Sequence, residues 1–210
     1  MPSNKEFIER LLKYKNVLVN LKKLGIVKVF SDNIGDATGL TSSQVRKDFS
    51  VLKLQGNKRG GYNIDKLIND LNIILGKNKP QKVIVAGCGK IGRAMIEYHG
   101  FNGESIQIIA GFDSDSQKAG SDNIVPIFHI DEMEAYIKKH DVKVGIIAVP
   151  ETAATDVYEK MISGGIKGIL NFARVHLREY QGTVVTNVNI ELQIENLFYF
   201  VNIAEKKQKN

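Results

Sequence analysis

Cysteine is almost absent from this sequence: Cys88 is the only one among 210 residues. A lone cysteine excludes a disulfide framework and any multi-cysteine zinc site, and the four histidines lack the spacing of metal ligands. We therefore expect no metal ion and a reducing compartment such as the cytoplasm.

Long hydrophobic runs are also missing. No apolar stretch reaches the roughly 18 residues that a membrane span needs, and the amphipathic N-terminus lacks the apolar core of a signal peptide. With 43% hydrophobic and 25% charged residues, the chain has the composition of an ordinary globular protein. We expect a cytoplasmic protein with no membrane partner.

Negative charge is scarce in the first part of the chain. Residues 1–79 carry a net charge of +8, whereas residues 80–210 carry −2. A basic domain of this size favours nucleic acid as its partner. The polar stretch at residues 77–80 predicts the boundary between this domain and the next.

The basic part has the pattern of a helix-turn-helix protein. Apolar residues recur at helical spacing over residues 7–21, and Ser31 is placed to cap a short helix that ends at Ala37. Thr41 followed by Gln44 has the capping-box spacing for a third helix over residues 42–54.

The third helix should present a polar, basic face, because Val45, Phe49 and Leu52 recur at core spacing. The Gly-rich turn at residues 56–62 follows where a winged helix carries its wing, and another helix is expected over residues 64–75. A solvated basic face is the alternative. We predict these DNA-contacting residues: Arg10, Ser43, Gln44, Arg46, Lys47, Ser50, Lys58 and Arg59.

After residue 80 the spacing of the apolar residues changes, and short strand-like runs alternate with helical ones. Strands are expected at residues 82–86, 106–112, 124–128, 144–149 and 168–172, with helices at 93–99, 131–139 and 152–163. This alternation predicts an α/β fold with a doubly wound parallel sheet.

A G-x-G-x-x-G motif follows the first of these strands. Gly87 permits the tight turn, Gly89 lets a pyrophosphate approach the backbone, and Gly92 allows close helix packing. Asp113 ends the next strand, where it would bond both adenosine-ribose hydroxyls and favour NAD(H) over NADP(H). The alternative is a sharp turn that binds no ligand.

The loops after two later strands are expected to wall the same site. Cys88 is either a small residue filling the turn or a thiol activated by the helix N-terminus. The cofactor-binding residues predicted from the pattern are Gly87, Cys88, Gly89, Lys90, Ile91, Gly92, Asp113, Val149, Pro150, Asn171 and Phe172.

The last helical segment, residues 189–204, has an apolar surface too wide for one neighbour. It could pack on its own sheet or insert into a second subunit.

Several segments carry a family resemblance: VRKDFS at 45–50, AGCGKIGRA at 86–94, FDSD at 112–115 and GIKGILNFA at 165–173. Over nearly its whole length the chain resembles the Rex family of redox-sensing transcriptional repressors. The resemblance implies a homodimer that binds a palindromic double-stranded DNA operator, senses NAD and NADH, and is released from DNA by NADH.

The resemblance also implies three regions: a winged-helix domain at 1–79, a Rossmann domain at 80–187, and a helix exchanged between subunits with a polar tail at 188–210. In this comparison Arg46 and Lys47 match the DNA-reading pair of the family, and Lys58 or Arg59 stands in the wing. Tyr98 matches a tyrosine that senses the reduced cofactor.

The chain departs from the family pattern at its switch. The implied switch residues are Asn16, Tyr98, Asn189 and Ile190. Asn16 stands where the family has an arginine, and Asn189 where it has the acidic partner. The wing cations are displaced by one position, and Arg174 replaces a proline. We therefore expect a weakened response to NADH.

Two other functions fit part of the pattern. A small NAD-dependent oxidoreductase would use the glycines and Asp113, but about 130 residues leave no room for a substrate domain, and no general base is evident. A regulator that binds coenzyme A or another nucleotide would leave Asp113 without a role. We expect no catalytic residues.

Overall fold

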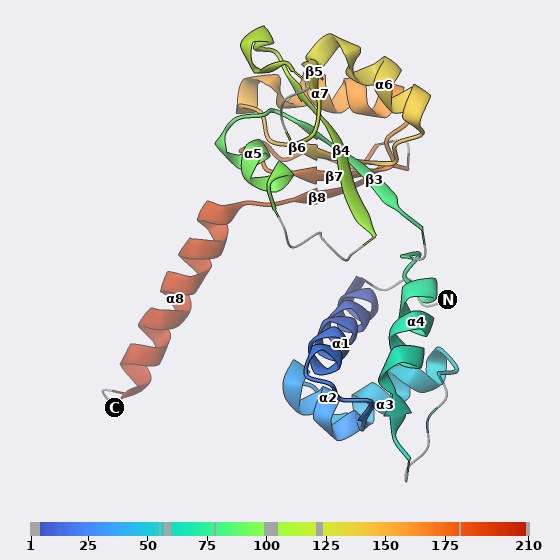
Figure 1. The fold of residues 1–210 in the computed structure, drawn as a ribbon. Coiled ribbons are helices and arrows are strands. Elements are labelled where there is room, and N and C mark those ends of the chain that lie inside the picture. Colours follow the sequence, from blue (N-terminus) through green and yellow to red (C-terminus); the bar gives the residue numbers. More distant parts are fainter. Residues whose placement is uncertain are drawn as a thin grey trace. The chain divides into compact units, whose positions relative to one another are not determined.

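The computed structural model describes residues 5–54, 56, 60–77, 79–98, 105–120, 124–180 and 182–208. The chain divides into two compact units, Met1–Lys79 and Pro80–Asn210 (Figure 1). The first unit is helical, and the second is built on a parallel sheet, so the predicted α/β fold with a helical first domain is confirmed.

The described residues of the first unit form the helices α1 (Lys5–Lys23), α2 (Ser31–Thr38), α3 (Ser42–Val51) and α4 (Ile64–Ile74). A short antiparallel pair joins β1 (Lys28–Val29) to β2 (Tyr62–Asn63). The helices bury one apolar stripe each, including Leu11 and Tyr14 of α1 and Phe49 of α3. Tyr14 and Tyr62 both pack edge-on against Phe49, at ring distances of 5.5 and 5.0 Å.

Capping follows the sequence signals only in part. The Thr41 hydroxyl accepts a hydrogen bond from the Gln44 amide at 3.1 Å, as the spacing predicts. The predicted cap at Ser31 is wrong, because Ser31 is the first residue of α2 and Phe30, which has no capping side chain, precedes the helix. The Asn33 side chain accepts a hydrogen bond from the Phe30 amide at 3.1 Å. The Ser31 hydroxyl instead accepts a bond from Arg46 on α3.

The second unit has a six-stranded sheet in the order β5-β4-β3-β6-β7-β8, and every neighbouring pair is parallel. Its strands are β3 (Gln81–Ala86), β4 (Ile106–Asp113), β5 (Ile127–His129), β6 (Val144–Ile147), β7 (Gly168–Asn171) and β8 (Val184–Asn187). β4 and β5 follow on one side of β3, and β6, β7 and β8 follow on the other side. This reversal of the strand order at β3 is the doubly wound arrangement.

Helices cover both faces of this sheet. Met95 and Ile96, from α5 (Lys90–Ile96), pack on the face that carries Val83 and Val85. The opposite face, with Ile84, packs against α6 (Met133–His140) and α7 (Glu151–Gly164). The alternation of side chains along β3 thus fills two apolar layers.

The sheet contains one strand that the sequence pattern did not predict. The edge strand β8 follows β7 through a segment whose described residues, 172–180 and 182–183, form no helix, so the alternation of strand and helix ends before it. The predicted strand at 124–128 is also shorter than expected, because β5 begins at Ile127.

Helix α8 (Ile190–Gln208) follows β8 and extends away from the sheet (Figure 1). Most of its large apolar side chains are at least 44% exposed, whereas Ile203 is half-buried. The exposed ones are Ile190, Leu192, Ile194, Leu197, Phe198, Tyr199, Phe200 and Val201. Packing on its own sheet, one of the two options, is therefore wrong. Among the described residues, no helix combines the length and apolarity that crossing a membrane would need.

Candidate functional site

The Gly-rich turn lies at the carboxyl end of β3, on the edge of the sheet where doubly wound folds bind ligands. Gly87 has φ +90°, and a Cβ there would lie 2.5 Å from the Ala148 carbonyl oxygen. A Cβ at Gly92 would lie 1.8 Å from the Gly87 carbonyl oxygen. At Gly89 a Cβ would have no described heavy atom within 4 Å, so the turn is closely packed inside and open outside.

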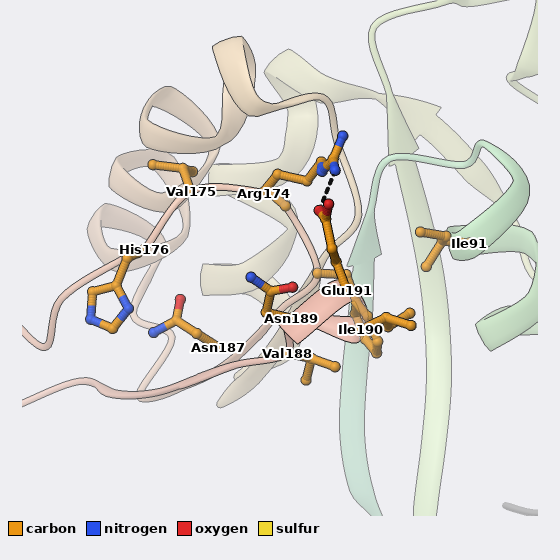
Figure 2. Close-up of a pocket in the computed structure, with 11 residues that line it drawn as sticks. Ile91, Arg174, Val175, His176, Asn187, Val188, Asn189, Ile190 and Glu191 are labelled. Carbon is orange, nitrogen blue, oxygen red and sulfur yellow. Dashed lines mark hydrogen bonds and ion pairs between the residues drawn. The ribbon is translucent and has the colours of Figure 1, made fainter. Parts of the chain in front are cut away.

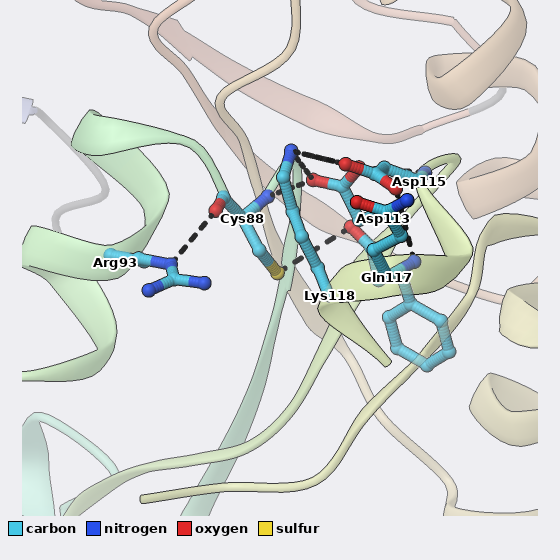
Figure 3. A network of polar contacts seen from close by, with 7 residues as sticks. Cys88, Arg93, Asp113, Asp115, Gln117 and Lys118 are labelled. Carbon is cyan, nitrogen blue, oxygen red and sulfur yellow. Dashed lines mark hydrogen bonds and ion pairs between the residues drawn. The ribbon is translucent and has the colours of Figure 1, made fainter. Parts of the chain in front are cut away.

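Asp113 at the end of β4 is tied to this turn (Figure 3). Its Oδ2 accepts a hydrogen bond from the Cys88 amide at 2.7 Å, and its Oδ1 accepts one from the Asp115 amide at 2.9 Å. The Lys118 ammonium lies 3.2 Å from Oδ1 and 3.1 Å from Oδ2. Lys118 was not predicted as a site residue, since a lysine in a polar loop suggests only a solvated side chain.

These contacts keep Asp113 ionised. Burial by itself would raise the pKa of this carboxyl, but the two backbone hydrogen bonds and Lys118 outweigh it and hold the pKa below its ordinary value. The site therefore presents a buried negative charge with a movable positive charge beside it.

Cys88 is fully buried in the turn. Burial, followed by the neighbouring Asp113 carboxylate, raises the pKa of its thiol to about 11. Because the thiolate is the reactive form, this environment argues against the redox-active alternative for Cys88 and favours the packing role.

Two cavities are lined by residues that follow the carboxyl ends of these strands, one by the Gly-rich turn itself and one by Ile91, which comes just after that turn. The first, which we call the Asp113 cavity, has a volume of about 440 Å³. Gly87, Gly89 and Asp113 line it, together with the predicted wall residues Val149 and Pro150.

The second, which we call the α8 cavity, has a volume of about 410 Å³ and lies where β7 and β8 lead into α8 (Figure 2). Ile91 and Phe172, both predicted site residues, line it, and so do Asn189 and Ile190. Arg174 and Glu191 also line it, and Arg174 donates a hydrogen bond to Glu191. That ion pair was not predicted.

Two further predicted cofactor residues differ in their surroundings. Asn171 is fully buried, and its amide nitrogen donates to the Val175 carbonyl and to Asn187, both at 2.8 Å. Its oxygen accepts from the Ala173 amide at 2.9 Å, so Asn171 shapes the loop that lines the α8 cavity. Lys90, in contrast, is exposed at the start of α5.

The outer face of α3 is polar and basic, as its periodicity predicts: Ser43, Arg46, Lys47 and Ser50 are exposed. Arg46 is partly engaged, since its Nη1 donates to Ser31 Oγ at 3.0 Å and lies 3.7 Å from Asp32. Half of the Arg46 side chain remains exposed.

The inner face of α3 holds a charged network that sequence reasoning missed. Asp48 is buried and accepts hydrogen bonds from Arg10, from the Tyr14 hydroxyl at 2.9 Å and from Gln44 at 2.7 Å. Two of the predicted DNA contacts, Arg10 and Gln44, are thus engaged inside the unit. Burial would raise the pKa of Asp48, but these hydrogen bonds hold it below its ordinary value.

Two predicted DNA contacts, Lys58 and Arg59, lie outside the described residues. Within the part of the chain that the structure describes, no cluster of histidine, cysteine and carboxylate side chains could hold a metal ion.

Comparison with known proteins decides the family. A family profile described as "Putative DNA-binding protein N-terminus" matches residues 5–50, and one described as "CoA binding domain" matches residues 78–175. The redox-sensing transcriptional repressor Rex of Pelotomaculum thermopropionicum is 36% identical over 96% of this chain and 94% of its own length. The chain belongs to the Rex family of redox-sensing transcriptional repressors.

Other Rex proteins match as closely in extent. Rex of Streptococcus uberis is 34% identical over 94% of each chain. The crystal structure of RSP, a Rex-family repressor, in complex with β-NADH covers 100% of this chain and 99% of its own, with 26% identity and a TM-score of 0.85. The crystal structure of RSP in complex with β-NAD⁺ and operator DNA covers 100% of this chain and 97% of its own. Its sequence identity is 26% and its TM-score is 0.89. The Rex family consists of repressors and not of enzymes, which disfavours the oxidoreductase alternative.

The positions expected to form the Rex switch are placed as follows. Asn16 is exposed on α1, and Tyr98 is exposed just after α5 and lines neither cavity. The Asn189 side chain accepts a hydrogen bond from the Leu192 amide at 3.0 Å and so caps α8. The roles of these residues in a Rex-type switch stay predictions.

Proposed function

We propose that this protein is a DNA-binding repressor that senses the ratio of NADH to NAD and leaves its operator when NADH binds. The observation that carries the proposal is the pair of cavities beside one Gly-rich turn, with Asp113 in one and the base of α8 at the other. A single dinucleotide laid over Gly89 would occupy both.

The described residues fit such a cofactor. The Asp113 cavity offers a carboxylate for the adenosine ribose, with Val149 and Pro150 as apolar walls. The turn at Gly89 leaves the room that a pyrophosphate needs. Phe172, Ile91 and Ile190 give the nicotinamide an apolar surface in the α8 cavity. The bound nicotinamide supplies the redox signal, since its ring is cationic when oxidised and neutral when reduced.

DNA would be bound by the other unit. The exposed side chains of Ser43, Arg46, Lys47 and Ser50 form the face that enters the major groove, and the net charge of +8 supplies phosphate contacts. Lys58 and Arg59 remain proposed contacts of the wing. Arg10 and Gln44 also remain proposed contacts, but because their side chains donate to buried Asp48, they would have to leave or share those bonds to reach DNA.

We further propose a homodimer that binds a palindromic operator. The exposed apolar side chains of α8 form a surface that monomeric proteins rarely leave uncovered, and exchange of this helix with a second subunit would bury it. A two-fold dimer reads two half-sites of double-stranded DNA. The same proposal places the protein in the cytoplasm, with the DNA it would bind, and involves neither a metal nor a membrane.

Two measurements on the full chain test this function. Selection of duplexes from a random library should return sequences with two-fold symmetry, and calorimetry should detect binding of NADH. Titration with coenzyme A separates the remaining alternative, since a coenzyme A regulator would bind that ligand and not NADH. The proposal would be overturned if the protein bound no duplex DNA, or if it bound no NADH.

A further inference from the structure

The ammonium group of Lys118 pairs with Asp113, the carboxylate that is proposed to bind the adenosine ribose. It bridges both oxygens of Asp113 at 3.2 and 3.1 Å (Figure 3), and both residues line the Asp113 cavity. The lysine side chain is 32% exposed, so it can move, whereas the carboxylate beneath it is buried.

The hydrogen-bonding capacity of Asp113 is already full. A carboxylate offers about four lone-pair positions. The Cys88 amide uses one position on Oδ2, and the Asp115 amide uses one position on Oδ1. Both donors are backbone amides of the site itself. Only the two positions shared by Lys118 can be exchanged for a ligand, so two ribose hydroxyls can bind Asp113 only when the ammonium moves away.

A displaced Lys118 would stay inside the same cavity. Its side chain also lines the cavity, and Asp115 lies 4.0 Å from its nitrogen. A lysine ammonium is a compact charge with three donors on a flexible stem. It would attract a phosphate on the ribose 2′ carbon, the group that the Asp113 carboxylate repels.

We propose that Lys118 is a specificity-determining residue of the Asp113 cavity. It competes with the ribose hydroxyls of NADH for Asp113 and pairs with the 2′-phosphate of NADPH. Both effects narrow the preference for NADH that Asp113 alone would impose. This inference rests on the proposed function, because it assumes that an adenine dinucleotide occupies the cavity.

The test compares Lys118→Met with Lys160→Met in the full chain. Lys160 lines the same cavity but pairs with Asp131 at 2.6 Å, so its replacement removes an equal charge without touching Asp113. Calorimetry gives the dissociation constants of NADH and NADPH, and of AMP and adenosine 2′,5′-bisphosphate as fragments that do not reach the α8 cavity.

We expect Lys118→Met to raise the NADPH-to-NADH ratio of dissociation constants about tenfold, the loss of one charge-assisted contact. Lys118→Met should raise the ratio of the dissociation constants of adenosine 2′,5′-bisphosphate and AMP by a similar factor. Lys160→Met should change either ratio by less than about twofold. An unchanged ratio in Lys118→Met, with NADH still bound, would overturn this inference alone. Binding of neither dinucleotide to the unmodified protein would overturn the proposed function together with it.

Discussion

The guanidinium of Arg10 on α1 donates two hydrogen bonds to the carboxylate of Asp48 on α3, at 2.7 and 3.0 Å. Asp48 is buried on the inner face of the helix whose outer face carries Arg46 and Lys47. The pair, with the Tyr14 hydroxyl, therefore fixes how α3 is seated in its unit, and through it the direction of the proposed DNA-reading side chains.

This network should be important for stability. Arg10→Ala leaves a buried carboxylate without its cation and should lower the free energy of unfolding by about 2–4 kcal/mol. Tyr14→Phe removes one hydrogen bond and should cost about 1 kcal/mol. Urea unfolding followed by circular dichroism measures both. Equal, negligible effects of the two substitutions would show that the network does not stabilise the unit.

The same network predicts a pH dependence. The folded-state pKa of Asp48 lies below its ordinary value, so its contribution to stability is complete above about pH 4 and is lost as pH falls through the lowered value. Asp48→Asn, which cannot ionise, should be less stable at pH 7 and should lose less on acidification. A parallel decline of both proteins as the pH falls from about 4 to 2 would contradict this assignment.

The outer face of α3 should govern DNA affinity through charge. Arg46→Ala and Lys47→Ala should each weaken binding to a selected duplex. Each should also reduce the slope of log affinity against log salt concentration by the amount that corresponds to about one phosphate contact. Lys58→Ala and Arg59→Ala should act in the same way if the wing contacts DNA. Lys23→Ala, at the end of α1, is the matched control. An unchanged salt slope in both α3 variants would exclude this face from the interface.

The apolar surface of α8 should hold the dimer together. Replacing Leu197 and Phe200 by lysine puts two charges into the surface and should produce a monomer in light scattering, because burying unpaired charges is costly. Glu195→Lys with Asn202→Lys changes polar, exposed positions of the same helix and should leave the dimer intact. A dimer that persists in the first variant would mean that the subunits associate elsewhere.

Cys88 should behave as an inert packing residue. Its buried thiol, with a pKa of about 11, should react slowly with a disulfide reagent at pH 7 and rapidly once the protein is unfolded in guanidinium. Peroxide should leave DNA binding unchanged. Rapid labelling of the folded protein would restore the redox alternative for this residue.

The sequence predicted features that depend on local spacing. Helix periodicity placed Val45 and Phe49 inside and Arg46 outside, and the strand-helix alternation predicted five of the strands. The sequence pattern did not predict β8, because the described residues between β7 and β8 form no helix. The strand-helix-strand unit that predicts a parallel strand is therefore missing there.

Contacts between distant residues could not be predicted. Arg10 and Asp48 are 38 residues apart, and nothing in either local sequence indicates the ion pair. Lys118 is close to Asp113 in sequence, but only the turn that brings it back over the carboxylate reveals its position in the cavity. The proposed roles of Tyr98, Asn16 and Asn189 depend on a second subunit and on bound ligands, so they stay predictions.

The two asparagines make the strength of the switch testable. An arginine–aspartate contact, as the family resemblance implies, is worth about 1.5–3 kcal/mol, whereas two asparagines exchange a neutral bond worth about 0.5–1.5 kcal/mol. Asn16→Arg with Asn189→Asp should therefore strengthen the response. The substitution keeps the cap of α8, since aspartate caps as well as asparagine.

The affinity of the full-length protein for a selected palindromic duplex, titrated with saturating NADH and then with saturating NAD, tests the central claim most directly. We predict that NADH weakens DNA binding relative to NAD by a factor below about ten, and that the doubly substituted protein shows a larger factor. Equal affinity for the duplex with both cofactors bound would contradict the proposed sensing function, and a factor of about a hundred or more would contradict the weakened switch.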